Sequence, residues 1–209
     1  WLSNMNGNYN IEKDILTICE NKLKDLEKIN IKVELLKPKI NTDILWNSWT
    51  TLRAKSIYED TLAMNISDIN TMTYQAIWEY NKGKEIKSEE IRLALDLKQQ
   101  CLSQINLIFL NFDFLALPSA QIFPFDKNLQ YPKNINNIEL DTYHRWLEVF
   151  ILSSLLELPT ITIPVGFNKD GMPMGMQIIG RNKDDLKVFN FANMYEKAFN
   201  FSKNKPKLT

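Results

Sequence analysis

Serine hydroxyls are the groups in this chain that could attack an amide or ester carbonyl. A nucleophilic serine at a sharp strand-to-helix turn needs small neighbours, because the backbone bends tightly and must leave room for substrate. No serine here has a glycine beside it; the ten serines are Ser3, Ser48, Ser56, Ser67, Ser88, Ser103, Ser119, Ser153, Ser154 and Ser202. Ser153 and Ser154 stand together in an apolar helical run, where a hydroxyl bonds back to a carbonyl one turn earlier. We therefore predict that this pair packs at a helix interface and that the chain holds no catalytic residue.

His144 is the only histidine, and an imidazole can act as a general base near neutral pH. No nucleophile is recognisably placed to use it, so we predict a surface or helix-capping histidine. Cys19 and Cys101 lie far apart, which predicts buried or partly buried free thiols in a reducing cytoplasm rather than a disulfide framework. These residues match no metal-ligand spacing, and no glycine-rich phosphate loop is found. Neither a metal nor a cofactor is expected.

The composition is that of a packed globular chain without net charge. Hydrophobic residues make up 44% of the 209 residues, and the 25 basic and 25 acidic side chains cancel. A neutral chain has no overall field that attracts nucleic acid or an anionic membrane surface. No apolar run approaches the roughly 20 residues that span a bilayer. We therefore expect no nucleic acid and no membrane among the partners, and a cytoplasmic location.

The segment 158–180 holds two predicted strands with a turn between them. Residues 160–165 are apolar and β-branched, which is typical of a buried strand, and residues 174–179 have a similar character. Residues 168–171 have the composition of a hairpin loop, in which Gly171 can take a positive φ. Prolines and glycines lie at strand ends and at close approaches of the backbone. With one glutamine they form a structural motif of Pro159, Pro164, Gly166, Gly171, Pro173, Gly175, Gln177 and Gly180.

Helices are expected on either side of these strands in the sequence. Apolar residues at three- and four-residue steps predict a helix over 11–27, capped by Asn10, and another over 184–199. Residues 140–156 also read as a helix. Thr42 is expected to cap the first of three further helices.

Between these helices the sequence predicts two more strands and a loop. Residues 31–35 alternate apolar and charged side chains, as an edge strand does, and 114–117 read as a short buried strand. Residues 118–138 contain prolines and asparagines and read as a long surface loop. The expected fold class is therefore α/β: a partial mixed β-sheet covered by several α-helices. We expect a single domain over residues 1–209, with a helical layer at about 42–110.

The spacing within segment 158–180 also carries a family resemblance. It resembles the C-terminal core of the amidase-signature hydrolases, through the pattern Pro159-x-x-x-x-Pro164-x-Gly166-Phe167 and Gly171-x-Pro173-x-Gly175-x-Gln177-x-x-Gly180. Weaker similarity covers most of the chain. The resemblance implies that the intact enzyme hydrolyses carboxylic amides through an acyl-serine intermediate. It also places the catalytic lysine and a glycine- and serine-rich loop on an upstream part of the same enzyme, since the present chain has no such loop.

Three residues are singled out beside this resemblance. Trp146 falls where the family builds part of the acyl-side wall of the substrate pocket, so it is the candidate substrate-binding residue; the alternative is a core tryptophan on an amphipathic helix. Gln177 stands on a predicted buried strand and must find hydrogen-bond partners there, so we predict that it braces neighbouring loops. Glu157 stands where family members often have glycine, which predicts a change in helix–strand packing.

We therefore expect the C-terminal segment of an amide hydrolase, inactive alone, whose intact enzyme takes a small-molecule amide. One alternative is an interaction module, such as the complementing half of a split amidase, which would expose strand edges or an apolar patch. Another is part of the glutamine-hydrolysing chain of a tRNA-dependent amidotransferase. In that branch an acidic residue that holds free glutamine is implied near Trp146, and a tryptophan cannot fill that role. A homo-oligomer is left open.

Overall fold

The computed structural model describes residues 1–66 and 68–204, so Ser67 and residues 205–209 lie outside the described chain. The chain divides into two compact units. The first consists of Trp1–Lys39 and Ile108–Thr209, and the second of Ile40–Leu107. The single domain expected over residues 1–209, with its helical layer at about 42–110, stays a prediction.

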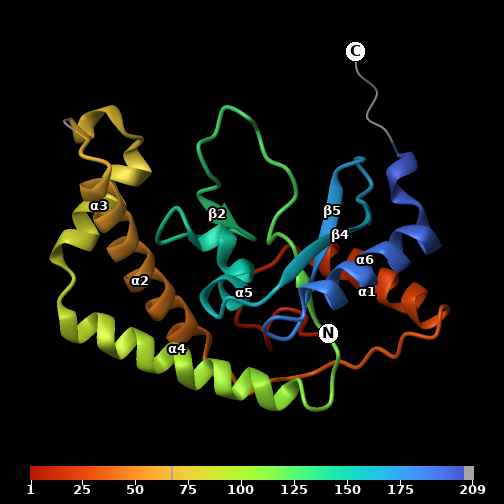
Figure 1. Cartoon of the computed structure of the whole chain (residues 1–209). Coiled ribbons are helices and arrows are strands. Elements are labelled where there is room, and N and C mark those ends of the chain that lie inside the picture. The colour runs from red at the N-terminus through yellow and green to blue at the C-terminus, as the bar shows by residue number, and fades with distance from the viewer. Residues whose placement is uncertain (67, 205–209) are drawn as a thin grey trace. The chain divides into compact units, whose positions relative to one another are not determined.

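A three-stranded antiparallel sheet lies in the first unit (Figure 1). Its strands, in spatial order, are β1 (Leu115–Pro118), β5 (Pro173–Ile179) and β4 (Thr160–Phe167). In β4 and β5, Thr160 lies opposite Ile179. The two strands predicted from the glycine-rich segment are therefore paired side by side, and the predicted short strand joins them as β1. The α/β fold class is confirmed.

The central strand β5 and the edge strand β4 differ in burial. On β4, Ile163 and Val165 are buried, whereas Thr160, Thr162 and Pro164 are exposed. Most of β5 is buried. The prediction of a buried strand is thus right for β5 and wrong for β4. A strand that is covered on one face alone alternates between core and solvent.

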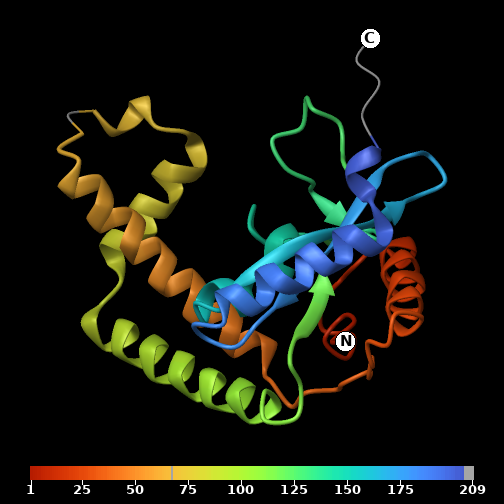
Figure 2. The same cartoon turned by 45° about the vertical axis from the view of Figure 1, so that its right-hand side comes forward.

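Two helices, α1 (Lys13–Glu27) and α6 (Asp185–Phe199), pack against β4 (Figure 2). Their buried residues recur at three- and four-residue steps, as predicted. These residues are Ile15, Cys19, Leu23 and Leu26 in α1, and Val188, Phe191 and Tyr195 in α6. The hydroxyl of Tyr195 donates to the backbone carbonyl of Pro164, which ties α6 to the edge strand.

The start of α1 differs from the prediction, because Asn10 is used elsewhere. Its side-chain amide donates to the carbonyl of Ile135 at 2.8 Å instead of capping the helix. Ile135 belongs to β2 (Asn134–Ile135), which forms a short antiparallel hairpin with β3 (Ile138–Glu139). The segment 118–138, predicted as a loop, therefore contains β2 and is anchored to the chain just before α1.

The helix predicted over 140–156 is shorter in the structure. A 3-10 helix η2 (Arg145–Phe150) leads directly into α5 (Ile151–Leu155). The N–H of Leu140 donates to the carbonyl of Lys133 at 2.9 Å, across the base of the β2–β3 hairpin. Residue 140 is thus held by the hairpin, so the prediction was wrong for the first turn.

Residues 31–35, predicted as an edge strand, form no strand in the structure. The N–H of Leu36 donates to the carbonyl of Trp1 at 2.9 Å, and the amino group of Trp1 donates to the carbonyl of Glu34 at 2.8 Å. Contacts to a single residue do not build a ladder of paired strands. The alternation of apolar and charged residues here belongs to an unpaired extended segment.

The second unit is helical, as predicted for its residues. Its elements are α2 (Thr42–Ala63), η1 (Ile69–Thr71), α3 (Tyr74–Glu85) and α4 (Ser88–Ile108), whose last residue belongs to the first unit. The cap of α2 is Asn41 rather than the predicted Thr42, because the Asn41 side chain accepts hydrogen bonds from two N–H groups in the first turn.

A close approach of α2 and α3 explains the glycine at position 83, where the sequence also allows a helix end. The helix α3 continues through Gly83 to Glu85. A β-carbon at Gly83 would lie 2.0 Å from the carbonyl oxygen of Ala54 in α2. The glycine therefore lets two backbones meet and does not end a helix. An ion pair between Arg53 and Glu79, at 2.7 Å, joins the same two helices.

Candidate functional site

A cavity of about 480 Å³ in the first unit contains the one predicted substrate-binding residue. Its walls come from the chain after β1, from η2, and from β4 and β5. The lining residues are Ser119, Ala120, Ile122, Phe123, Pro124, Phe125, Trp146, Thr162, Pro164, Pro173, Met174 and Gly175. A volume of this size is typical of small-molecule sites.

Trp146 forms an aromatic corner of this cavity with Phe125. The two ring centroids are 5.4 Å apart and the ring planes meet at 86°, an edge-to-face arrangement that aromatic pairs favour. Trp146 is half-buried, so part of its indole remains available at the cavity. Sequence reasoning predicted Trp146 and missed Phe125, whose segment carried only the signal of a loop.

The η2 turn that carries Trp146 is held by a group of ion pairs around Arg145. The Arg145 guanidinium binds Asp141 through Nε at 3.0 Å and Nη2 at 2.6 Å, and binds Glu148 through Nη1 at 2.9 Å. The hydrogen bond from Arg145 lowers the pKa of the Asp141 carboxyl below its ordinary value. Arg145 thus pairs with a carboxylate on either side of it along the chain, beside the cavity.

Gly175 leaves no room for a side chain at the sheet end of the cavity. A β-carbon there would lie 2.7 Å from Ser119 Oγ and 2.7 Å from Thr162 Cγ2. The N–H of Ser119 donates to the carbonyl of Gly175 at 3.0 Å, which continues the pairing beyond the end of β1. The glycine of the sequence motif thus allows β1, β4 and β5 to meet at the cavity, and it brings the Ser119 hydroxyl there.

Gln177 is fully buried and makes the hydrogen bonds that its burial requires. Its Nε2 donates to the carbonyls of Pro118 at 2.9 Å and Val149 at 3.0 Å, and its Oε1 accepts from Ser153 Oγ at 3.2 Å. One amide therefore ties β5 to the end of β1, to η2 and to α5. The prediction that Gln177 braces neighbouring segments is confirmed.

A second buried glutamine, Gln121, extends this bracing and was not identified from the sequence. Its Nε2 donates to the carbonyl of Asn10 at 3.0 Å, and its Oε1 accepts from the N–H of Val149 at 3.4 Å. Val149 is thus held through its carbonyl by Gln177 and through its N–H by Gln121. No pattern around residue 121 signals such a role, because its partners are 28 and 111 residues away.

The other glycines of the motif lie where the chain turns or packs closely. Gly166 has a φ of +146° at the irregularity of β4, and Gly171 has a φ of +77° in the hairpin loop. A β-carbon at Gly180 would lie 2.5 Å from Val188 in α6. The N–H of Gly180 also donates to the carbonyl of Pro159 at 2.8 Å. These three glycines lie outside the cavity lining, whereas Pro164, Pro173 and Gly175 of the same motif belong to it.

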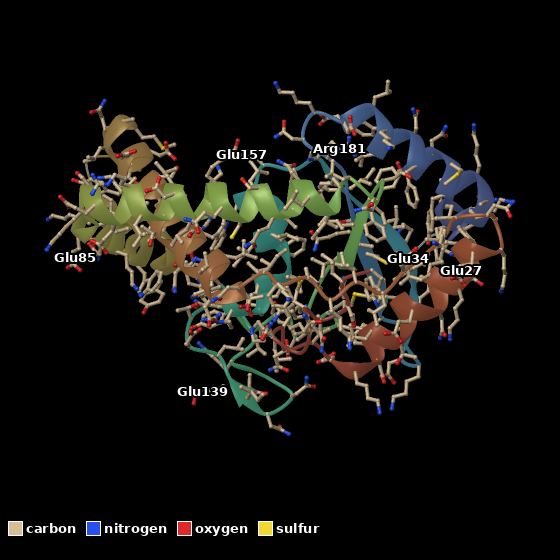
Figure 3. All side chains as sticks on the ribbon, turned by 90° about the horizontal axis from the view of Figure 1, so that it is seen from below. Glu27, Glu34, Glu85, Glu139, Glu157 and Arg181 are labelled. Atoms are coloured by element: carbon tan, nitrogen blue, oxygen red, sulfur yellow. The ribbon has the colours of Figure 1, made fainter. Side chains whose placement is uncertain are left out.

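Glu157 takes a backbone conformation that glycine adopts without a steric penalty. Its φ is +54°, in the left-handed region. The N–H groups of Glu157 and Leu158 donate to the carbonyls of Ser154 and Ser153, at 3.3 Å and 3.0 Å, which ends α5 before β4. The glutamate side chain is exposed (Figure 3). A glutamate therefore holds a left-handed turn at the end of α5, and the change in helix–strand packing expected at this position stays a prediction.

The serine pair and the histidine were assigned to packing and to the surface, respectively. The Ser153 hydroxyl donates to the carbonyl of Phe150 at 3.2 Å, as predicted for a serine in a helical run. The prediction that the pair packs at an interface is right for the buried Ser153 and wrong for Ser154, which is exposed. His144 is 2% exposed and lies against Tyr143 with ring centroids 3.8 Å apart. The prediction of a surface histidine is therefore wrong. His144 does stand at the N-cap position of η2, but its side chain makes no capping hydrogen bond.

Both cysteines are free and buried, as predicted. Burial raises the pKa of the Cys19 thiol to about 12, so this thiol is neutral near pH 7. Within residues 1–66 and 68–204, no group of three or more histidine, cysteine, aspartate or glutamate side chains is arranged to hold a metal ion. In the same residues, no helix is both long and apolar enough to cross a membrane.

A second cavity in the first unit, of about 710 Å³, lies against α1 and α6. Its wall includes Leu23 from α1, Phe191 and Met194 from α6, and Ile178 from β5. Strand alternation places Ile178 on the opposite face of the sheet from Gln177. None of the predicted site residues lines this cavity.

Comparison with known proteins assigns a family to the chain. Residues 7–189 match the family model described as Amidase. Among curated relatives, the A-type subunit of glutamyl-tRNA(Gln) amidotransferase from Shouchella clausii (strain KSM-K16) is 49% identical over 55 residues, which cover 26% of this chain and 11% of the relative. The same protein from Ehrlichia canis (strain Jake) is 32% identical over 147 residues, which cover 62% of this chain and 28% of the relative.

Solved structures share the fold at lower identity. A bacterial aryl acylamidase of the amidase-signature family matches with a TM-score of 0.81 and 20% identity, over 94% of this chain and 42% of that chain. The A-type subunit of glutamyl-tRNA(Gln) amidotransferase from Thermotoga maritima matches with a TM-score of 0.66 and 22% identity, over 93% and 41%. The present chain thus spans less than half of the length of these proteins.

Proposed function

The chain belongs to the amidase family, and from that premise we propose that it is the C-terminal segment of a hydrolase that cleaves carboxylic amides. In the intact enzyme, a serine activated by a lysine through a bridging serine would form an acyl-enzyme intermediate, and backbone N–H groups would hold the developing oxyanion. Those groups would lie on the upstream part of the enzyme. The present chain would complete the sheet and supply one wall of the pocket for the acyl group.

The observation that carries this proposal is the cavity with Trp146 in its wall. Its lining comes from the chain after β1, from η2, and from β4 and β5, and the buried amide of Gln177 ties β5 to the end of β1 and to η2. Catalysis requires the reacting group to be held within a narrow range of positions. A braced, largely apolar wall would do this for the acyl part of an amide while other residues perform the chemistry.

We also propose that the chain alone does not hydrolyse amides. The Ser153 hydroxyl is engaged with the carbonyl of Phe150 and with Gln177 Oε1. Ser119 lines the cavity, but it sits in the sequence Pro118-Ser119-Ala120 without the glycine-rich turn that a nucleophilic serine needs. Catalytic turnover by the purified chain that Ser119→Ala abolishes would contradict this part of the proposal.

A complementation experiment tests the proposal as a whole. The purified chain is mixed with a separately produced upstream segment that carries the glycine- and serine-rich loop and the lysine of an amidase. Release of ammonia from simple amides is then measured for each part alone and for the mixture. We expect hydrolysis from the mixture alone, and we expect Trp146→Ala in this chain to lower kcat/KM. A mixture that forms a complex but never hydrolyses any amide would contradict the proposal.

The same experiment examines the alternative of a free-standing module that binds its upstream half. The exposed residues Thr160, Thr162 and Pro164 on the edge strand β4 favour this reading, because a complementing half would need an accessible edge or face. Tight association of the two segments, with hydrolysis restored, would indicate a split enzyme. Its cytoplasmic location and its oligomeric state stay predictions.

The glutamine-hydrolysing chain of a tRNA-dependent amidotransferase is the second candidate function. It is favoured by the 49% identity to the Shouchella clausii protein over 55 residues. Trp146, which stands near the place of the implied acidic residue, weighs against it. A complemented enzyme that hydrolyses glutamine and does not hydrolyse apolar amides would establish this candidate over the general amidase.

A further inference from the structure

The cavity beside Trp146 has a composition that selects among amides by charge. Among the described residues that line it, the polar side-chain groups are the hydroxyls of Ser119 and Thr162 and the indole N–H of Trp146; no lining side chain is charged. A charged group that lies against such a lining loses part of its hydration and finds no counter-ion among the lining side chains, which costs more free energy than placing an apolar group there.

Three charged residues beside this lining, Arg145, Glu148 and Asp126, are engaged with other groups. The Glu12 carboxylate accepts a hydrogen bond from the N–H of the lining residue Phe123 at 3.2 Å, and Lys127, two residues beyond Phe125, is exposed. Arg145 and Glu148, on either side of Trp146 along η2, bind each other, and Arg145 also binds Asp141. The Asp126 carboxylate, next to Phe125, accepts hydrogen bonds from the N–H and Nδ2 of Asn128, both at 2.9 Å. These contacts direct the Arg145 guanidinium toward its two carboxylates, and the Asp126 carboxylate toward Asn128, rather than toward a ligand.

The apolar surfaces of the cavity suit a flat hydrocarbon group. Trp146 and Phe125 present ring surfaces at 86° to each other. Pro164, Pro173 and Met174 add rigid or polarisable apolar surface from β4 and β5. The sheet backbone comes close at Gly175, since a β-carbon there would meet Ser119 and Thr162. Any side chain at that position would take space from a bound ring.

We infer that this cavity takes the uncharged, apolar acyl group of an amide, an aromatic ring in particular, and excludes acyl groups that carry an ammonium or carboxylate. This inference rests on the proposed function, because it names the substrate class of the proposed site. It separates the site from one built for free glutamine, whose ammonium and carboxylate would both need charged partners.

Binding of two matched probes to the purified chain tests the inference. The probes are 4-methylbenzamide, which is neutral, and 4-(aminomethyl)benzamide, which has nearly the same shape but is cationic at pH 7; L-glutamine is the third ligand. Dissociation constants are measured by ligand-observed NMR titration. We expect 4-methylbenzamide to bind at least about tenfold more tightly than either charged ligand. Equal or tighter binding of a charged ligand, or no saturable binding of 4-methylbenzamide, would overturn the inference.

Variants locate the binding in the cavity. Trp146→Ala is expected to weaken 4-methylbenzamide about tenfold. The matched control Phe167→Ala, an exposed aromatic residue at the far end of β4 and outside the cavity lining, is expected to bind like the parent chain. If Trp146→Ala fails to fold, Thr162→Phe at an exposed strand position is expected to fill the cavity and weaken binding similarly. If a cavity variant and the control change the dissociation constant of 4-methylbenzamide equally, the ligand does not bind in this cavity.

The inference and the proposed function fail in different ways, because binding is read without hydrolysis. A chain that binds the neutral probe at Trp146 but never supports hydrolysis in the complementation experiment contradicts the proposed function alone. A complemented enzyme that hydrolyses 4-(aminomethyl)benzamide in preference to 4-methylbenzamide contradicts the inference alone.

Discussion

The two faces of the three-stranded sheet in the first unit are held by different forces. On one face, Ile163, Met176 and Ile178 are buried on the side covered by α1 and α6. On the other face, Gln177 ties β5 to η2, and Gln121 ties the segment after β1 to η2, through buried hydrogen bonds. The cavity opens beside them. Apolar packing tolerates small shifts of its members, whereas hydrogen bonds fix donors and acceptors within a few tenths of an ångström. The face with the proposed ligand site is the one built from polar braces.

The largest expected effect comes from the helix-covered face. Met176 is fully buried, and Met176→Ala should lower the free energy of unfolding by about 3 kcal/mol through lost burial and a cavity. Urea unfolding followed by circular dichroism measures this. Binding of 4-methylbenzamide to the folded variant should stay unchanged, since Met176 is not among the cavity lining. If Met176→Ala weakens binding and leaves the stability unchanged, the claim that the two faces have separate roles is wrong.

Removal of the buried amide should have a smaller effect on stability and a larger one on the site. Gln177→Leu leaves the carbonyls of Pro118 and Val149 without their donor, which should cost about 2 kcal/mol of unfolding free energy. It should also speed amide hydrogen exchange in η2 and weaken ligand binding. The exposed Gln100→Leu serves as the matched control. Unchanged exchange in η2 would show that Gln177 does not brace the cavity.

The glycine between the two faces should come next. Gly175→Ala places a β-carbon 2.7 Å from Ser119 Oγ and Thr162 Cγ2, and the required shift should cost about 1 to 2 kcal/mol. Thermal unfolding measures the loss. The double variant Gly175→Ala, Thr162→Ser removes the Cγ2 contact and should recover part of it. If the single variant is as stable as the parent chain, the close approach of the strands at this point is not real.

The two ends of β4 offer a smaller contrast, in which a substitution should stabilise the chain. Gly171 and Glu157 both have positive φ, at +77° and +54°, but only glycine takes this conformation without a steric penalty. Glu157→Gly should therefore raise the free energy of unfolding by about 1 kcal/mol. Glu157→Ala is the control, because it removes the side chain and keeps the strain. A destabilising Glu157→Gly would show that the glutamate side chain outweighs the strain.

The smallest effect should come from pH, at the turn that carries Trp146. Arg145 lowers the pKa of Asp141 in the folded chain, so the folded state favours the ionised carboxylate. This contribution is present above the unfolded pKa of about 3.9 and is lost as the pH falls through the lower folded value. Asp141→Asn should lose less stability than the parent chain between pH 5 and pH 3 in urea titrations. If the free energies of unfolding of the variant and the parent chain fall equally as the pH is lowered, Asp141 does not contribute to this pH dependence.

Sequence reasoning predicted the part of the fold that depends on local pattern. The helices α1 and α6 follow from the spacing of residues such as Ile15 and Val188, and β4 and β5 follow from β-branched runs with Gly171 between them. The same reasoning failed where contacts with a segment distant in the sequence determine the local structure. Asn10 has a good capping residue type, but Ile135, 125 residues away, takes its amide. Residues 31–35 have a strand pattern and no partner strand.

The candidate site was predictable through Trp146 and Gln177, and for different reasons. Gln177 is a polar residue in an apolar strand, which by itself demands partners. Trp146 came from the resemblance to a family. Phe125 and Thr162 gave no signal, because a loop phenylalanine and a strand threonine are common and only the fold brings them to one cavity. His144 was placed on the surface because nothing in its neighbours predicts burial.

Photochemical labelling tests most directly whether the face with the polar braces holds the amide. A benzamide that carries a diazirine on its ring is irradiated with the purified chain, and the modified residues are identified by mass spectrometry, with excess 4-methylbenzamide as competitor. The account predicts competed labelling at Trp146, Phe125 or Met174. Competed labelling confined to Leu23, Ile178 or Met194, which line the cavity against α1 and α6, would contradict it.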